Sequence, residues 1–559
     1  MSKRNFVVLV VFLAAANLCY GQLRRLSPDL AGRDSQAPVN VIIRYQRPLE
    51  QRHIDAVVRR GGHALRRLDL VNGAAYSVPA NALAELANDP DVAYISPDRP
   101  VHAALSASTQ LPQDYKLQAV NANVAQINGF NGNDIGIAVI DSGITNRPDF
   151  RESAYSSAAI AASNQFRIVH SENLINGGST DDSYGHGTHV AGILGGNGAM
   201  SFGVYSGVAP AANIINLVAL DNTGSGTDST VIAAIQRAVQ LQQRYNIEVI
   251  NLSLGRPVME SYTQDPLCQA VEAAWNAGIV VVVAAGNDGR DNSQGTEGYA
   301  TITAPGNDPY VITVGAMKTE NTATRSDDLI ASYSSKGPTL LDHVVKPDLV
   351  APGNLIISVL GDGTLPQEYP QSVVDTNYFM LSGTSMAAPM VSGAAAMLLQ
   401  QNPNLTPDQV KARLMATAWK NFPVSSTATD PTTGITYTSY YDIFTVGAGY
   451  LDVWAALNSG ALANGSAASP IATYNSTDGS VTLSNLSGQS VIWGTSLIWG
   501  TSVIWGTSAV SGDSLIWGTS VIWGTSAPSN LSIIWGTSLI WGTSVPTGQT
   551  SLVAIDGEQ

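Results

Sequence analysis

Two segments of the chain carry residues that can act as a nucleophile and as its base. Residues 380–397 read MLSGTSMAAPMVSGAAAM, in which Ser385 precedes a run of Ala and Met that favours a helix. A hydroxyl at the start of a helix lies at the positive end of the helix dipole, where developing negative charge is stabilised. Residues 185–192 read GHGTHVAG and place His186 and His189 on one helical face. Such a serine can attack a carbonyl if a histidine takes its proton.

A carboxylate completes this set. Residues 135–144 read IGIAVIDSGI, an apolar and β-branched run that predicts a buried strand ending at Asp141. Open α/β sheets place catalytic groups at the carboxyl ends of their strands. A carboxylate that accepts from one ring nitrogen of a histidine fixes the tautomer in which the other nitrogen is a base. Asp141, His186 and Ser385 follow one of the chain orders known for such a triad. For Ser385 alone, the alternative is a small-residue cap on a core helix.

Together, the three segments resemble the active-site segments of the subtilisin-like serine proteases, the subtilases. The matching motifs are DSGI, GHGTHVAG and GTSMAAP, and the resemblance extends from about Asp134 to Asp452. It implies that Ser385 is the nucleophile, that His186 is the general base and then the acid, and that Asp141 orients and stabilises the imidazolium. Four linking segments match as well: INLSLG (250–255), AAGNDG (284–289), SSKGP (334–338) and KPDLVAPG (346–353).

Asn287 is the expected donor of an oxyanion hole. Residues 278–286, GIVVVVAAG, predict a fully buried strand, which Asn287 follows directly. An ordinary turn is the alternative. The resemblance implies that the Asn287 side chain donates to the oxyanion together with the backbone amide of Ser385. His189 competes with His186 for the role of base. The motif assigns that role to His186, and we expect His189 to be a packed or hydrogen-bonded structural histidine.

The resemblance also implies where a substrate binds. Ser253, Leu254 and Gly255 are expected to line the cleft and to pair with an extended substrate as an added strand. Ala285 and Gly286 are expected to form a wall of the pocket for the residue before the cut. The partner implied is therefore a protein or peptide substrate.

Two further positions match family sites. Thr303 stands at the floor of the pocket, where many relatives carry Gly, and this argues against a wide pocket for aromatic side chains. Asp149 matches a ligand of a structural calcium ion, which requires oxygen ligands from a loop. The loop at residues 195–206 departs from the usual pattern, and a plain surface carboxylate is the alternative for Asp149. The chemistry itself requires no cofactor.

Length and composition favour a secreted protein of several domains. The 559 residues are 44% hydrophobic, which supports a sizeable core. Residues 1–21 predict a signal peptide, with basic residues before an apolar run and cleavage before Gln22. A lipoprotein cysteine is the alternative for Cys19. Cys268 is the other cysteine and is expected to be a buried thiol without a disulfide partner. Beyond residue 21, we expect no transmembrane segment.

Residues 22–105 predict a small domain with the order β-α-β-β-α-β, which is ferredoxin-like. It resembles the inhibitor-I9-type propeptide of subtilases, which inhibits the enzyme and whose end lies in the substrate cleft until it is cut. The cut is expected near Ala104 or Leu105. A permanently attached accessory domain is the alternative. The expected elements are strands at 39–45 and 91–98, a pair of strands around Asn72-Gly73, and helices at 53–62 and 80–89.

Residues 106–458 predict the catalytic domain. Apolar strand-like runs alternate with helical ones, which favours an α/β fold with a subtilisin-like, doubly wound and mostly parallel sheet. Residues 447–458 look like the closing helix of the family. The other expected elements are strands at 135–140, 213–220, 247–252, 279–285 and 310–315, and helices at 230–245 and 267–277.

Residues 459–559 form a tail rich in Ser, Gly, Thr and Asn, without Lys or Arg. The hexamer [VLI]IWGTS occurs seven times between residues 491 and 544. An even period keeps each position on the same side of a strand, so the tail is β-prone. The alternatives for its role are surface attachment through the aromatic faces, a self-packing β extension, and a removable second propeptide. The repeated tryptophans are Trp493, Trp499, Trp505, Trp517, Trp523, Trp535 and Trp541.

The net charge of the chain indicates which kinds of partner it can bind. The formal net charge of −15 argues against nucleic acid. The basic N-terminal part suits an acidic body as its partner. The sequence therefore predicts a secreted serine endopeptidase, made as a self-processing zymogen, that hydrolyses peptide bonds through an acyl-enzyme. The alternative is a secreted surface-binding protein that uses the subtilase fold as a scaffold and the Trp repeats for attachment.

Overall fold

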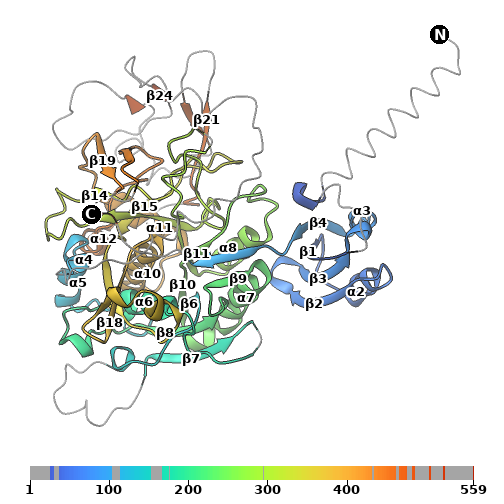
Figure 1. The fold of residues 1–559 in the computed structure, drawn as a ribbon, viewed down its shortest axis with the longest axis horizontal. Helices are drawn as coiled ribbons and strands as arrows, with labels where there is room; N and C mark the ends of the chain where they lie inside the picture. Colours follow the sequence, from blue (N-terminus) through green and yellow to red (C-terminus); the bar gives the residue numbers. More distant parts are fainter. Residues whose placement is uncertain are drawn as a thin grey trace, which may run out of the picture.

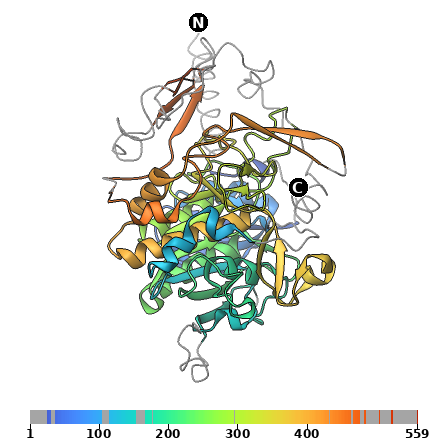
Figure 2. The same ribbon diagram turned by 90° about the vertical axis from the view of Figure 1, so that its left-hand side faces the viewer.

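A small domain and a larger body make up the computed structural model. Figure 1 shows the small domain, in blue, at one side of the body. Figures 1 and 2 both place the orange and red strands, which come last in the chain, at one end of the body. The predicted signal peptide and most of the WGTS repeats lie outside the described residues. The structure describes residues 25–30, 37–103, 114–152, 166–175, 177–293, 295–430, 433–460, 462, 465–474, 481–484, 503–504, 520–522 and 558.

The body is built around an eight-stranded sheet. Its strands follow the order β14-β13-β12-β10-β6-β8-β7, and β15 pairs with β13. Every pairing is parallel except that of β13 with β14. The predicted α/β fold with a mostly parallel sheet is thus confirmed. The strands are β6 (Gly136–Asp141), β7 (Ile168–Asn173), β8 (Asn213–Val218), β10 (Ile247–Leu252), β12 (Val280–Ala284), β13 (Ile312–Lys318), β14 (Leu329–Ile330) and β15 (Leu349–Pro352).

The central strands are apolar because helices cover both faces of the sheet. All residues of β6 and β12, GIAVID and VVVVA, are buried. The helix α6 (His186–Gly195) packs against α10 (Thr384–Gln401), and α7 (Asp228–Tyr245) packs against α8 (Pro266–Asn276). Figure 1 shows these two pairs on either side of β6 and β10. The other helices are α4 (Lys116–Ala119), α5 (Ala122–Ile127), α9 (Thr364–Glu368), α11 (Pro407–Thr417) and α12 (Val453–Leu457).

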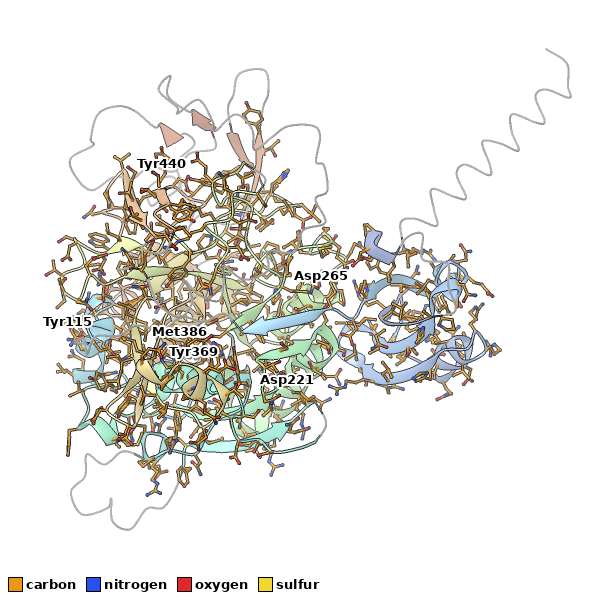
Figure 3. The ribbon with its side chains drawn as sticks, in the orientation of Figure 1. Tyr115, Asp221, Asp265, Tyr369, Met386 and Tyr440 are labelled. Carbon is orange, nitrogen blue, oxygen red and sulfur yellow. The ribbon has the colours of Figure 1, made fainter. Side chains whose placement is uncertain are left out.

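The helix α10 runs through the core. It is buried from Thr384 to Leu399, as expected for a helix that is apolar or small on every face. At Gly393 a β-carbon would lie 2.6 Å from that of Val208, so only glycine allows this close approach. Figure 3 labels Met386, in the first turn of this helix, in the middle of the body. The start of α10 is therefore held by packing on all sides.

The predicted helix at 447–458 is shorter than expected. The structure has only α12, Val453–Leu457, in this region. Gly447 and Gly449 have φ angles of 57° and 131°, which a right-handed helix does not allow. The glycines instead turn the chain beside β15, where the Val350 N–H donates to the Gly449 carbonyl at 2.9 Å.

The small domain has the predicted element order β-α-β-β-α-β. Its four strands form an antiparallel sheet with the order β2-β3-β1-β4, and it has a hydrophobic core of its own. Asn72 turns the chain into β3 with a φ angle of 52°. The predicted second helix is a short 3-10 turn followed by α3. The elements are β1 (Pro38–Tyr45), α2 (Gln51–Val58), β2 (His63–Leu68), β3 (Gly73–Pro79), α3 (Leu83–Ala87) and β4 (Val92–Pro97).

A short strand links the small domain to the body. This strand, β5 (Pro100–Ala103), lies between β9 (Ser225–Thr227) and β11 (Leu254–Gly255) in an antiparallel three-stranded sheet. Figure 1 shows it passing from the small domain into the body. The segment that follows the small domain is thus held by main-chain pairing on both of its edges.

The remaining strands form smaller sheets. None of the helices in the described ranges is long and apolar enough to cross a membrane. Two short pieces of the repeat tail, β23 and β24, are strands. The strands are β16 (Ile356–Val359), β17 (Val373–Val374), β18 (Tyr378–Leu381), β19 (Ser425–Thr429), β20 (Thr436–Tyr440), β21 (Ile471–Tyr474), β22 (Val481–Ser484), β23 (Val503–Ile504) and β24 (Ser520–Ile522).

Candidate active site

Asp141 and His186 are hydrogen-bonded to each other inside the protein. Asp141 is the last residue of β6, and His186 is the first of α6. Nδ1 of His186 lies 2.7 Å from Oδ1 of Asp141, and both side chains are buried. Nδ1 carries the proton, because an ionised carboxylate only accepts. Nε2 of His186 is buried and has no hydrogen-bond partner among the described residues, so it is the nitrogen that is free to act as a base.

A second buried carboxylate, which the sequence analysis missed, joins the loop after β6 to the start of α6. Asp182 accepts from the Ser142 hydroxyl at 2.8 Å and from the backbone N–H groups of Gly185 and Thr188 at 2.7 and 2.8 Å. The Gly187 N–H donates to the Ser142 hydroxyl at 3.0 Å. These bonds satisfy N–H groups in the first turn of α6 and fix the helix end that carries the histidine. Burial raises the pKa of Asp182, while these hydrogen bonds oppose the rise.

Ser385 lies in the first turn of α10 at the same edge of the sheet. Its hydroxyl donates to the carbonyl of Ser253 at 3.0 Å, and the Ser253 hydroxyl donates to the Ser385 carbonyl at 2.8 Å. Ser253 follows β10, and β10 is the parallel neighbour of β6, with Asn251 paired to Val139. Ser253 therefore lies level with Asp141, and the three residues predicted as a triad gather at the carboxyl ends of two adjacent strands.

Thr384, the residue directly before Ser385, anchors the side chain of Asn287. The N–H and the hydroxyl of Thr384 both donate to Oδ1 of Asn287, at 2.9 and 3.0 Å. Because Oδ1 accepts both of these bonds, the side-chain NH₂ points the other way and is free to donate. Gly286 donates its N–H to the Thr384 hydroxyl at 3.1 Å. Thr384, for which the sequence predicted no role, thus joins the Asn287 loop to α10.

His189 is the structural histidine that the sequence predicts. Its side chain is completely buried, and Nε2 donates toward the carbonyls of Ile356 and Phe379 at 3.1 and 2.9 Å. Burial, followed by the charge of His186, lowers the pKa of His189 to about 3. His189 is therefore neutral at ordinary pH and holds α6 against β16 and β18.

The predicted cleft residues lie beside β5. Leu254 pairs with Ala103 and Gly255 with His102, which is the strand addition expected for an extended substrate. The opposite wall is β9, where Gly226 pairs with Val101. The strand β9 was not predicted from the sequence. A hint of this strand in the sequence is the run of three small residues, 225–227, that directly precedes the long helix α7.

Thr303 lies where the pocket floor is expected. A β-carbon on Gly255 would meet the Thr303 hydroxyl at 2.4 Å, and one on Gly286 would meet the Thr303 methyl at 2.8 Å. The Thr303 hydroxyl also donates to the carbonyl of Ala285 at 3.3 Å. The side chain of Thr303 therefore fills space between the two predicted walls, and it is bonded to Ala285 as well.

Asp149 does not fit the calcium ligand expected from the sequence. Its carboxylate is buried and accepts from the Met200 N–H and the Tyr378 hydroxyl, both at 2.8 Å. The guanidinium of Arg167 donates to the Asp149 and Gly195 carbonyls, so a cation already occupies this loop. Among the described residues, no group of three His, Cys, Asp or Glu residues could hold a metal ion. The alternative of a surface carboxylate is wrong, because Asp149 is buried, and we derive no role for calcium at this residue.

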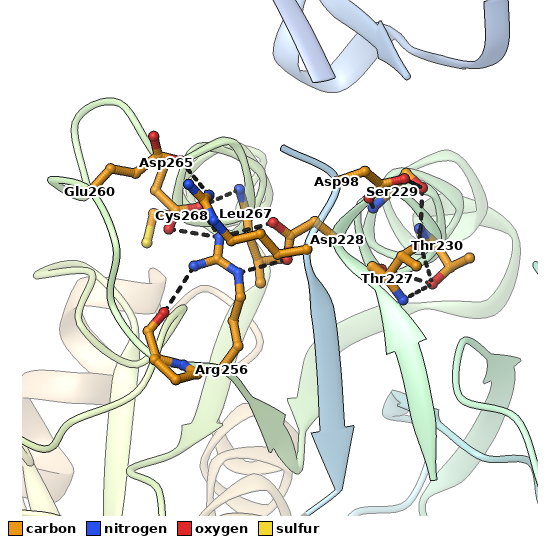
Figure 4. Close-up of polar contacts among 12 residues, drawn as sticks. Asp98, Thr227, Asp228, Ser229, Thr230, Arg256, Glu260, Asp265, Leu267 and Cys268 are labelled. Atoms are coloured by element: carbon orange, nitrogen blue, oxygen red, sulfur yellow. Dashed lines mark hydrogen bonds and ion pairs between the residues drawn. The ribbon is translucent and has the colours of Figure 1, made fainter. Parts of the chain in front are cut away.

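Buried charges lie next to β11. The guanidinium of Arg256 donates to Asp228 and Asp265 at 2.8 to 2.9 Å, as the dashed lines in Figure 4 show. Asp228 begins α7 and Asp265 caps α8, so one arginine joins the starts of two helices. These carboxylates raise the pKa of Arg256 although burial lowers it. Figure 3 labels Asp265 on the side of the body that faces the small domain.

This arrangement can perform acyl transfer. It combines a hydroxyl at the start of a helix, a histidine with one free ring nitrogen and an asparagine amide that is free to donate. The strand pairing of β5 shows that an extended chain fits beside them. The chemistry needs no metal ion, since a general base activates the nucleophile.

Comparison with known proteins places this chain in a family. A family model described as the Subtilase family matches residues 132–439. The chain is 37% identical over 358 residues to the serine protease AprX of Bacillus subtilis strain 168, which covers 62% of this chain and 74% of AprX. It is 35% identical over 365 residues to subtilisin E of the same strain, which covers 65% of this chain and 80% of subtilisin E.

A solved structure shows the same fold. Fervidolysin from Fervidobacterium pennivorans, described as a keratinolytic enzyme related to subtilisin, superposes with a TM-score of 0.56 at 22% identity. The match covers 78% of this chain and 63% of the fervidolysin chain, so this chain spans less than two thirds of that structure.

Proposed function

The chain belongs to the subtilase family and is a serine-type endopeptidase, and we propose that it is secreted as a zymogen that removes its own N-terminal domain. The proposal of a zymogen rests on the position of β5 (Pro100–Ala103), which lies between the two walls of the proposed substrate cleft. The signal-like residues 1–21 support secretion.

In this proposal Ser385 attacks the scissile carbonyl. His186 Nε2 takes the serine proton and returns it to the leaving amine, while Asp141 holds Nδ1–H and stabilises the imidazolium. In the present structure the Ser385 hydroxyl donates to the Ser253 carbonyl instead. The hydroxyl must therefore leave this bond and turn to His186 before attack.

The oxyanion is stabilised from two sides. The side-chain NH₂ of Asn287 and the backbone N–H of Ser385 are the proposed donors. Thr384 fixes the Asn287 amide before substrate arrives, through its two bonds to Oδ1. This donor costs no reorganisation during the reaction, because its direction is already set.

The small domain is the proposed intramolecular inhibitor. Its last segment occupies the backbone positions of an extended substrate, and residues just after Ala103 are the proposed cut. Two contacts support this docking. Asp98 accepts from the N–H and the hydroxyl of Ser229 at 2.8 and 2.5 Å, at the start of α7 (Figure 4). Arg99 pairs with Glu260 at 2.7 Å. A carboxylate at a helix N-terminus is favoured by the helix dipole.

The test is the intact mass of the purified wild type beside Ser385→Ala. We expect the wild type to lose a fragment ending near residue 104, and the variant to keep it. Cleavage at the same place in the variant would mean that another enzyme makes the cut. If both proteins kept the N-terminal domain and cleaved no peptide, the alternative function as a surface-binding protein would stand.

A further inference from the structure

Glu558 follows the repeats in the sequence and is buried in the body. Its side chain is 2% exposed. One carboxylate oxygen accepts from the guanidinium of Arg290 at 2.9 Å and from the hydroxyl of Ser332, and the other accepts from the Ser332 N–H at 2.7 Å. Bonds from a charged guanidinium and from a backbone N–H make this a specific carboxylate site.

The backbone of Glu558 is held as well. The side-chain NH₂ of Asn354 donates to the Glu558 carbonyl at 2.9 Å, and the Glu558 N–H donates to Asn354 Oδ1 at 3.0 Å. One side-chain amide thus pairs with both backbone groups of a single residue, which fixes the direction of the bound segment. Arg290, Ser332 and Asn354, which we call the Glu558 site, are themselves mostly buried.

Arg290 is positioned independently of Glu558. It donates to Asp430 at 3.0 Å and to the Ser332 hydroxyl at 2.6 Å, and its guanidinium lies 4.8 Å from the ring centroid of Tyr437. The β19–β20 hairpin that carries Tyr437 therefore holds the arginine in place. Arg290 thus has partners other than the glutamate, which favour the same position of the arginine when the glutamate is absent.

The tail is fixed to the body at its other end too. The N–H of Val345 donates to the Pro470 carbonyl, and the N–H of Ala472 donates to the His343 carbonyl, both at 2.8 Å. Pro470 and Ala472 precede the repeats in the sequence, and Glu558 follows them. The two attachments involve different segments of the body, 343–345 on one side and Arg290, Ser332 and Asn354 on the other.

We propose that the Glu558 site is a docking site for the segment after the repeats, so that the tail is attached to the body both before the repeats, at Pro470 and Ala472, and after them, at Glu558. The occupant is Glu558 of the same chain. The site adjoins the loop of Asn287, since Gly289 donates to the Tyr333 carbonyl at 2.8 Å next to Ser332. Docking of Glu558 therefore braces the segment that supports this loop.

Hydrogen exchange of the full chain tests the docking directly, because the Ser332 N–H donates to Glu558. The experiment uses the Ser385→Ala background, whose intact mass is checked so that the tail is present. We expect Glu558→Ala to speed exchange in the peptide that contains Ser332 by at least about tenfold, and Glu558→Gln to have a smaller effect. Asp556→Asn is the matched control, which removes the same charge two residues away and should change nothing.

A second variant probes the site from the body side. Asn354→Ala leaves Ser332 and Glu558 intact but removes both bonds to the Glu558 backbone. We expect it to speed exchange at Ser332 as well, and to add little to Glu558→Ala, because both changes release the same segment. Unchanged exchange at Ser332 in Glu558→Ala would overturn the proposal. A dimer in the parent that becomes a monomer in Glu558→Ala would also overturn it, by placing the glutamate in a second copy.

Discussion

Thr384 fixes the orientation of the Asn287 side chain by donating two hydrogen bonds to its oxygen, at 2.9 and 3.0 Å. Both donors come from the residue directly before Ser385. The start of one helix thus carries the proposed nucleophile and also orients the proposed oxyanion donor. Any shift of α10 moves both groups together, so their relative geometry is preserved.

Asn287→Ala tests the oxyanion role. We expect kcat for a peptide substrate to fall about 100- to 1,000-fold with little change in KM, the size found for removal of this kind of donor in subtilisin. The reason is that the oxyanion exists only in the transition state and the tetrahedral intermediate. Thr384→Val is the companion variant. It keeps one of the two orienting bonds, and a loss of about tenfold is expected. A change confined to KM in Asn287→Ala would contradict the assignment.

The two histidines of α6 are expected to differ sharply in their effect on catalysis. His186→Ala should reduce kcat as severely as Ser385→Ala, because no described residue other than His186 combines a bond to Asp141 with a free ring nitrogen. His189→Gln should retain most of the activity, since the Gln amide can still donate to the carbonyls of Ile356 and Phe379. Steady-state kinetics of the three variants decide the matter. Loss of activity in His189→Gln alone would reverse the assignment of the base.

His189 also predicts a pH dependence of stability. Its pKa is about 3 in the folded protein, against about 6.5 when unfolded, so the folded state favours the neutral ring. Because the folded protein disfavours the charged ring, His189 stabilises the folded state at pH values above 6.5. This contribution to stability is lost progressively as the pH falls from 6.5 toward 3. Between pH 7 and pH 5 the loss from this residue is about 2 kcal/mol.

The measurement is urea unfolding at pH 7 and pH 5 in the Ser385→Ala background. We expect the free energy of unfolding to fall by about 2 kcal/mol less in the His189→Gln variant than in its parent, because all other titrating groups are shared. An equal fall in both proteins would mean that His189 is charged in the folded state or accessible to water.

The strands and the positions of Asp141 and Asn287 at their ends were predictable because their signals are local. The all-apolar run before Asp141 and the valines before Asn287 indicate buried strands ending in polar residues, and the sequence alone locates them. Asp182 and Arg256 were not found, since their partners are brought together only by folding. The helix expected at 447–458 was predicted too long, because the glycines at 447 and 449 turn the chain before the helix begins at Val453. Glu558 gave no signal, because its partners lie more than 200 residues earlier.

Asp149 predicts a stability effect that calcium does not modify. In Asp149→Asn, the amide oxygen can still accept from one of the two donors, the Met200 N–H or the Tyr378 hydroxyl. The other donor then faces the amide NH₂, which cannot accept a hydrogen bond. We expect a destabilisation of about 1–2 kcal/mol, seen as a lower Tm. The loss in Tm should be the same in excess calcium and in EDTA, because Met200 and Tyr378 occupy both carboxylate oxygens. A loss seen only in calcium would show that Asp149 is a ligand after all.

The pair of Arg99 and Glu260 predicts how firmly the N-terminal domain is held. Arg99 follows this domain and Glu260 belongs to the body, and their side chains are only 7% and 3% exposed at a separation of 2.7 Å. In Glu260→Gln, the buried guanidinium of Arg99 loses the negative charge of its partner and has fewer hydrogen-bond acceptors than in the wild type. Because Asp29 and Ser27 still accept from it, we expect a loss of about 1–3 kcal/mol, or roughly 5- to 150-fold faster release of the cleaved domain.

Release is followed in the full-length protein as the appearance of peptidase activity after self-cleavage. The matched control is Glu85→Gln, which breaks the pair of Arg60 and Glu85 at 3.0 Å within the N-terminal domain. Because the Glu85 side chain is 68% exposed, this surface pair contributes little, and the rate of activation should not change. If both variants activated at the wild-type rate, the buried pair would not hold the domain, and the strand pairing of β5 would have to carry the inhibition by itself.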